Sequence, residues 1–148
     1  MIIETSRFGP VEVDESRVIT FAKGLLGFSR YKHYVLIEPA HDGYFWWLQS
    51  LETSDLAFVV TDPSLFVPSY KVVLRPEQMA EMGMQSIDDA QVFVIVNKCD
   101  GVLTGNLQGP LVIPLNNRNA EQLVLCDRKF TTRVPLVELS QRVEAIPA

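Results

Sequence analysis

The sequence predicts an all-β, mainly antiparallel domain with one short helix. Segments rich in β-branched and aromatic residues recur along the 148-residue chain, and Gly, Pro, Asn and Asp separate them at short intervals. Parallel strands would need crossover helices, for which the chain leaves little room. The segments by themselves therefore favour either an antiparallel sandwich or a small closed barrel.

The expected strands are short stretches that end at turn-forming residues. In chain order they are Arg17–Phe21, Tyr34–Glu38, Tyr44–Gln49, Leu56–Thr61, Tyr70–Leu74, Gln91–Asn97, Leu111–Ile113 and Gln122–Cys126.

Residues 75–83 lack β-branched side chains and predict a short helix over about residues 76–83. Pro76 suits the first helical position, and Gly83 can end the helix. Met79 and Met82 lie close enough in sequence to share a helix face, so core packing is the expected role of this pair.

Length and composition predict one domain over residues 1–148. A chain of this length buries roughly two thirds of its unfolded surface, so a single core can stabilise it. The sequence contains no internal repeat, low-complexity tract or linker. Leu136, Val137, Leu139 and Val143 lie near helical spacing, and we expect residues after about 137 to form a loose or weakly helical tail.

The charge balance is acidic. Lys and Arg number 13 and Asp and Glu 18, which gives a net charge of −5. Nucleic-acid binding depends on clustered Lys and Arg, so we expect no direct contact with nucleic acid. An acidic chain suits a basic protein partner, and it equally suits plain solubility.

Targeting and membrane signals are not evident. The N-terminus has neither the basic nor the apolar region of a secretory signal. The longest apolar runs, Leu56–Val60 and Val92–Val96, are far shorter than the roughly 20 residues of a membrane span. Cys99 and Cys126 form no CxxC pair, which suits a reducing compartment. We therefore expect a cytoplasmic protein that does not bind membranes.

The motifs that could carry catalysis lack their partners. Residues 97–100 match the NKxD pattern that reads guanine in GTPases, but no Gly-Lys pair supplies the phosphate loop, so a turn after a strand is expected. His33 and His41 lack metal-ligand spacing, and nothing positions either beside Cys99 or Cys126. We expect no catalytic, cofactor-binding or metal-binding residues.

Several unusual segments occur in a specific order. They are Thr5–Gly9, Phe21–Phe28, Trp47–Ser50, Leu56–Val60, Asp62–Pro63 with Phe66 and Tyr70, Gly105–Ile113, Asn117–Arg118 with Ala120, and Gln122–Leu125. Together they resemble the FliW family of flagellar assembly factors over about residues 3–136. The chain departs from the usual family pattern at Ala22, at Trp46 and in the loop of residues 114–118.

The resemblance implies a small, mainly antiparallel β-barrel that is cytoplasmic, non-enzymatic and monomeric when free. It implies two partners, newly made flagellin and CsrA, the basic RNA-binding regulator that represses flagellin translation. The free FliW-like protein would hold CsrA off the flagellin message, and accumulating flagellin would draw it away from CsrA.

Two alternatives remain open. The first is a chaperone that binds flagellin without regulating CsrA. The second is a small enzyme with a Cys or His site in the barrel. That enzyme would need an apolar pocket holding His33 or His41 beside a cysteine or a carboxylate.

A proline-bounded loop supplies the first candidates for partner binding. Residues 62–70 read as a loop yet carry apolar side chains, and the candidates there are Asp62, Pro63, Phe66 and Tyr70. Apolar residues in this loop either contact the C-terminal helical region of flagellin or cover an open end of the barrel.

A strand and a polar loop supply the remaining candidates. Alternation puts Trp46 and Trp47 on opposite faces of their strand, one in the core and the other nearer the surface, and it does not indicate which is which. We take Trp47 as a candidate interface anchor, and the alternative is a tryptophan that is only half-buried. Asn116, Asn117 and Arg118 form the polar loop. This loop is either a partner contact or a turn in which Asn accepts a positive φ, with Arg118 bracing backbone carbonyls.

Overall fold

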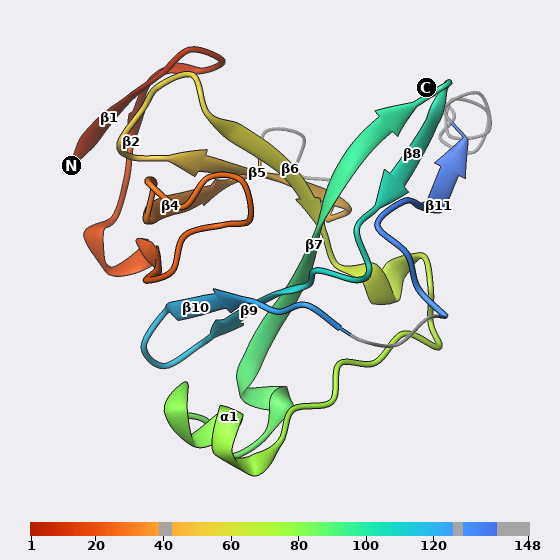
Figure 1. The fold of residues 1–148 in the computed structure, drawn as a ribbon. Coiled ribbons are helices and arrows are strands. Elements are labelled where there is room, and N and C mark those ends of the chain that lie inside the picture. The colour runs from red at the N-terminus through yellow and green to blue at the C-terminus, as the bar shows by residue number, and fades with distance from the viewer. Residues whose placement is uncertain (39–42, 126–128, 139–148) are drawn as a thin grey trace.

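The computed structural model describes the backbone of residues 1–38, 43–125 and 129–138. Strands dominate these residues, as predicted (Figure 1). The strands are β1 (Ile2–Thr5), β2 (Gly9–Glu12), β3 (Ile19–Phe21), β4 (His33–Ile37), β5 (Phe45–Ser50), β6 (Ala57–Thr61), β7 (Ala90–Cys99), β8 (Val102–Gly105), β9 (Leu111–Pro114), β10 (Asn119–Gln122) and β11 (Val134–Glu138). The helices are α1 (Pro76–Glu81) and three single turns of 3₁₀-helix, η1 (Glu15–Arg17), η2 (Pro63–Leu65) and η3 (Ile87–Asp89).

The central feature is a closed barrel. Strands β7, β6, β5, β4, β3, β10 and β9 pair in this order, and pairing of β9 with β7 closes the ring. Neighbouring strands of the ring are antiparallel except β3 and β10, which run parallel with Thr20 opposite Asn119. The mainly antiparallel barrel is thereby confirmed.

The ten-residue strand β7 organises the molecule because its two halves have different partners. Ala90–Phe93 pair with β9, whereas the pairing with β6 begins only at Val94, opposite Thr61. On the side that β6 occupies, Ala90–Phe93 therefore have no partner strand among the described residues. The second half of β7 pairs with both β6 and β8, and β11 adds to the far edge of β8.

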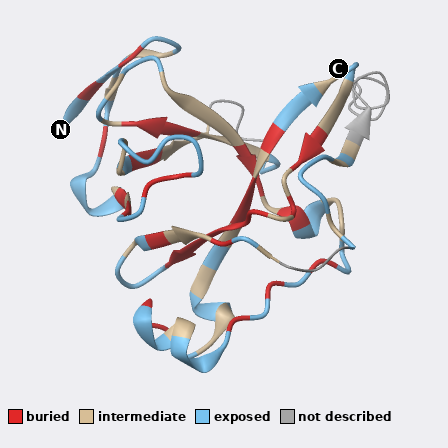
Figure 2. Ribbon diagram, viewed as in Figure 1, coloured by how far each residue is buried: buried red, intermediate tan, exposed pale blue. Residues whose placement is uncertain are grey.

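Side chains alternate between the barrel interior and the outer face. On β5, Trp46 and Leu48 contribute to the inner cluster, and on β7 Phe93 does so. The neighbouring residue Val94 instead joins a second apolar cluster outside the barrel, formed with residues 67–87. Figure 2 shows buried residues concentrated along the barrel strands and exposed residues around α1.

The short helix is confirmed with small changes at its end. α1 begins at Pro76 and ends at Glu81, and Gly83 follows with φ of +71°. Met82 is buried in the outer cluster and Met79 packs against it, which confirms the predicted core role of the pair. The helices within the described ranges span at most six residues, too few to cross a bilayer.

Two sequence predictions on the C-terminal half are wrong. The expected strand Gln122–Cys126 lies earlier, at Asn119–Gln122, because the turn of residues 115–118 delivers the chain directly to β3 and β9. Leu136 and Val137, whose spacing contributed to the predicted helical tail, instead belong to strand β11, which pairs with β8. Residues 139–148 of the predicted tail lie outside the described residues.

Candidate partner-binding surface

The segment Tyr70–Leu74 forms no strand, although its side chains alternate in burial as those of a strand do. Tyr70, Val72 and Leu74 are buried, while Lys71 and Val73 are exposed. The strand predicted at Tyr70–Leu74 is therefore wrong, and only the strand-like alternation of burial is present. Within the described chain, no hydrogen bond is made by the backbone groups of residues 71–74.

A groove of about 880 Å³ runs beside this segment. One wall is Tyr70–Leu74, and the other includes Ala90–Phe93, the half of β7 that β6 leaves uncovered. Trp46 and residues 62–64 line it at the end of β6. The groove thus lies between two extended stretches of backbone, neither of which has a partner strand on that side among the described residues.

The candidates of residues 62–70 divide between this groove and its surroundings. Asp62, Pro63 and Tyr70 line the groove, whereas Phe66 stacks on Phe45 with ring centroids 5.8 Å apart. The Asp62 carboxylate accepts a hydrogen bond of 2.9 Å from the backbone N–H of Ser64 and so caps η2.

Tyr70 acts as an anchor rather than as an exposed contact. Its side chain is buried, and its hydroxyl donates a hydrogen bond of 2.7 Å to the carbonyl oxygen of Leu107. Its ring meets Phe130 edge-on at 4.9 Å. Burial raises the pKa of the Tyr70 hydroxyl. Tyr70 therefore fixes the start of the extended segment to the outer cluster.

The two tryptophans point to opposite sides of β5, as alternation predicts. Trp46 packs in the barrel against Phe93 and donates from Nε1 to Glu38 at 2.7 Å. Trp47 lies on the outer face, where the Arg7 guanidinium sits 4.1 Å from the ring centroid. Both indoles are half-buried. Trp46 lines the groove, and Trp47 does not.

The polar loop ties neighbouring elements together. The Asn116 and Asn117 side-chain amides donate to the carbonyl oxygens of Gly83 and Met82, at 3.2 and 3.0 Å, just after α1. Arg118 donates from Nε to the carbonyl oxygen of Arg17 at 3.1 Å. The positive φ of the loop, +56°, belongs to Arg118 rather than to an Asn.

Both candidate regions meet at one end of the barrel. Arg118 lines a second groove of about 510 Å³, and the two grooves share Trp46, Gln91 and Phe93 in their linings. The structure therefore brings the 62–70 and 114–118 regions to either side of the uncovered half of β7. No local pattern in the sequence predicts this meeting point, because it depends on the residue at which β6 ends.

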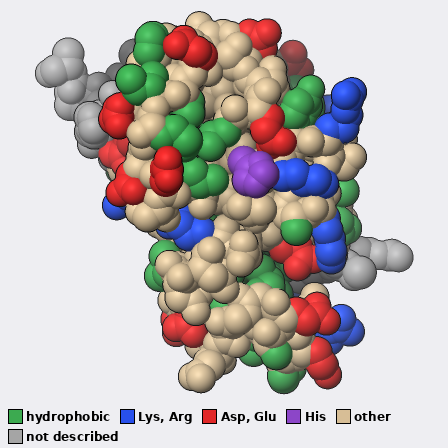
Figure 3. Space-filling view, turned by 90° about the vertical axis from the view of Figure 1, so that its left-hand side faces the viewer, with side chains coloured by type: hydrophobic (Ala, Val, Ile, Leu, Met, Phe, Trp, Pro, Cys, Tyr) green, Lys and Arg blue, Asp and Glu red, His purple; other side chains and the backbone are tan. Residues whose placement is uncertain are grey.

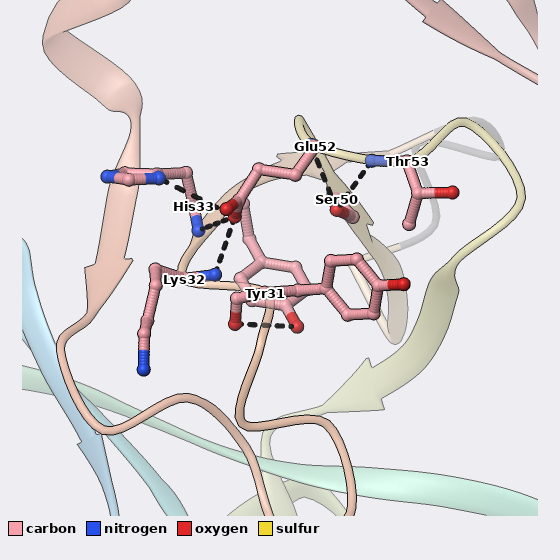
Figure 4. Close-up of polar contacts among 7 residues, drawn as sticks. Tyr31, Lys32, His33, Ser50, Glu52 and Thr53 are labelled. Carbon is pink, nitrogen blue, oxygen red and sulfur yellow. Dashed lines mark hydrogen bonds and ion pairs between the residues drawn. The ribbon is translucent and has the colours of Figure 1, made fainter.

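A polar cluster around Glu52 tests the enzyme alternative (Figure 4). Glu52 Oε1 accepts from the backbone N–H groups of Lys32 and His33, at 2.5 and 2.7 Å, and lies 3.5 Å from His33 Nδ1. Partial burial opposes ionisation of Glu52, but the two N–H groups outweigh it and lower its pKa. The buried Ser50 hydroxyl accepts from the backbone N–H groups of Glu52 and Thr53.

The Glu52 cluster joins the start of β4 to the connection between β5 and β6. His33 is exposed rather than enclosed in an apolar pocket, so the pocket that the enzyme alternative requires does not form around it. Within the described residues, no group of His, Cys, Asp and Glu is arranged to hold a metal ion. His41 and Cys126 lie outside the described residues.

The surface charge is dispersed on the face shown in Figure 3. Acidic side chains are spread over this face among hydrophobic and uncharged ones, and basic side chains lie mostly on the right of the view, with a few on the left. The net charge of −5 is therefore not concentrated in one patch on this face.

Comparison with known proteins gives consistent matches over nearly the whole chain. The family profile described as FliW protein matches residues 2–136. A flagellar assembly factor FliW of Bdellovibrio bacteriovorus is 42% identical, over 100% of this chain and 86% of the relative. One from Alkaliphilus metalliredigens is 34% identical, over 97% of this chain and 91% of the relative. A crystal structure of the flagellar assembly factor FliW superposes with a TM-score of 0.83 at 29% identity, covering 93% of this chain and 97% of that one.

Proposed function

This chain belongs to the FliW family of flagellar assembly factors, and we propose that it binds flagellin and the translational regulator CsrA and exchanges one for the other. The observation that carries the proposal is the family match, which extends over residues 2–136 and includes the groove-lining segments. The protein acts by binding, in the cytoplasm, and is a monomer when free.

The exchange couples flagellin supply to flagellin synthesis. While the free protein is abundant, it binds CsrA and keeps it off the flagellin message. As unassembled flagellin accumulates, it occupies the protein, and CsrA is free to repress translation. Two ligands that draw on one pool are coupled in this way by linkage.

Charge supports the CsrA half of the proposal. The chain carries a net charge of −5, and CsrA is a basic RNA-binding protein. Complementary charge raises the rate of association and the specificity of such a pair more than its affinity. Binding should therefore weaken as ionic strength rises.

The proposed contacts follow the grooves at the barrel end. Asp62 and Pro63 line the larger groove directly, and Phe66 extends the apolar surface beside η2. Tyr70 and the Asn116–Arg118 loop contribute by fixing the groove walls, given their hydrogen bonds to backbone carbonyls. Trp47, with Arg7 over its ring, forms a separate contact on the outer face.

Isothermal titration calorimetry tests the proposal with purified CsrA from the same host, with and without saturating flagellin. Tight binding that disappears when flagellin is present is the expected result. Binding to flagellin alone would support the alternative, a flagellin chaperone without CsrA regulation. Binding to neither protein would refute both functions.

A matched pair of variants locates the contact. Phe66→Ala removes an apolar side chain that the proposal places at the interface, so flagellin affinity should fall about tenfold or more. Phe28→Ala removes an aromatic ring that packs edge-on against Phe58 and lines neither groove, and it serves as the comparison. Equal losses in both variants would argue against the groove region as the contact.

A further inference from the structure

We infer that Tyr70–Leu74 is a docking edge for an extended peptide with acidic residues on either side of an apolar one. The peptide would add to this segment as a β-strand and fill the adjoining groove. This goes beyond the proposed function, because it holds whichever protein supplies the peptide and whether or not CsrA is bound.

The backbone N–H and C=O groups of residues 71–74 are unpaired within the described chain, and hydrogen bonds hold the residues at both ends of the segment. Both ends are held: Tyr70 donates from its N–H to Val67, and Arg75 donates from its N–H to the Gln78 side chain. A strand edge ordered before binding costs little further entropy when a peptide pairs with it.

The side chains fix the register that a guest must adopt. Val72 and Leu74 are buried in the outer cluster, so they anchor the segment. Lys71, Val73 and Arg75 then point outward in a row, and Val73 is 84% exposed. Side chains directly opposite one another on paired strands interact, so a guest residue faces each member of this row.

The positive charges of Lys71 and Arg75 determine which side chains a bound peptide should carry. Lys71 and Arg75 form no ion pair within the described chain. A second copy of the same segment would bring like charges together in either direction, which disfavours self-pairing. Carboxylates two residues on either side of an apolar residue match Lys71, Val73 and Arg75.

The groove gives room for the other face of the guest, and apolar side chains form the larger part of its lining, with Asp62 and Asp88 also present. It measures about 880 Å³, and its far wall includes Ile87 and Val92. A smaller hollow of about 390 Å³ also touches Val73 and Leu74 and reaches Leu123 and Val124. The alternate residues of the guest, which face away from the Lys71 row, should accordingly be apolar.

The test is fluorescence anisotropy with the full chain and a labelled synthetic peptide. In the bound strand, the peptide side chains that face Lys71, Val73 and Arg75 are Glu, Val and Glu. The alternate side chains of the peptide, on its other face, are Val. Two control peptides are used. One has Lys in place of Glu, and the other has N-methyl groups on alternate backbone amides, which block strand pairing but keep every side chain.

We expect saturable binding of the acidic peptide, weaker by about tenfold or more for each control peptide, since the lost contacts are several hydrogen bonds or two ion pairs. Lys71→Glu with Arg75→Glu should reverse the preference towards the Lys peptide. Lys98→Glu, an exposed charge change at the far end of β7, should leave it unchanged.

Several outcomes would overturn the inference. These are absence of binding, equal binding of the N-methylated peptide, or an unchanged preference in the doubly reversed variant while its circular dichroism matches the parent. Concentration-dependent dimers in sedimentation that disappear in Val73→Asp would also overturn it, because they would make a second copy the occupant.

Discussion

At the scale of single residues, the Tyr70 hydroxyl gives a direct test of how the extended segment is held. Tyr70→Phe leaves the buried carbonyl oxygen of Leu107 without this donor. We expect a loss of about 1–2 kcal/mol in the free energy of unfolding, measured by urea denaturation. Tyr31→Phe is the control, because the Tyr31 hydroxyl makes no hydrogen bond within the described residues. Equal losses in both variants would show that the hydrogen bond from Tyr70 to Leu107 does not hold the segment in place.

Tyr34 gives a pH dependence of stability. The residue is fully buried in the barrel, and burial, followed by the nearby Glu52 carboxylate, raises its pKa to about 12. The unfolded chain loses this proton near pH 10, whereas the folded chain keeps it up to about pH 12. The free energy of unfolding therefore falls as pH rises from about 10 to 12. Below pH 10, Tyr34 contributes no pH dependence to stability.

Urea unfolding at pH 9 and pH 11 measures this effect. Between these values the parent should lose roughly 1 kcal/mol more than Tyr34→Phe does. The comparison cancels the other groups that titrate in the same range. A parent and a variant with the same pH dependence would contradict the assignment.

Single residues also show where sequence reasoning stops. Alternation on β5 correctly separated Trp46 from Trp47, because side-chain direction in a strand is a local property. The same reasoning could not find that Arg118, rather than an Asn, takes the positive φ, since its Nε bond to Arg17 comes from a distant element. It also missed Lys71 and Val73, whose exposure depends on the absence of a partner strand.

At the scale of elements, the turn between β3 and β4 depends on two glycines of different kind. Gly24 and Gly27 both have positive φ, +68° and +83°. A Cβ on Gly24 would lie 2.5 Å from the Cα of Ser29, whereas a Cβ on Gly27 meets nothing within 4 Å. Leu25, between them, is buried in the barrel cluster.

The two alanine variants should therefore differ in stability. Gly27→Ala should cost about 1 kcal/mol from backbone conformation alone. Gly24→Ala adds a backbone collision, and we expect at least about 2 kcal/mol more by urea unfolding. Similar values for the two variants would mean that the turn shifts freely, and that Leu25 does not hold it in place.

Most ring strands could be predicted as elements, and their connections could not. The apolar segments that became β4, β5, β6 and the centre of β7 carry strong local signals. The hairpin β1–β2 and strands β8 and β11 were missed, because they are short or of mixed composition. Whether Tyr70–Leu74 pairs is decided by distant strands, which no local pattern reports.

At the scale of the whole molecule, the ring and its extension should differ in local stability. β8 and β11 pair with the ring only through β7, whereas β5 and β6 have partners on both edges. Local opening of β8 and β11 therefore breaks fewer contacts. Native-state hydrogen exchange should show opening of paired amides in β11 at least about tenfold more often than in β5. Equal protection would show that extension and ring unfold as one unit.

Closure of the ring has a consequence for synthesis of the chain. The parallel joint brings Thr20 beside Asn119, so the barrel cannot close until the chain has left the ribosome as far as Asn119. Until then, the sheet from β3 to β7 has an open edge at β3. Such a long-range joint also makes folding slow compared with local hairpins. Nascent chains of this protein therefore depend on their last third for protection of that edge against aggregation.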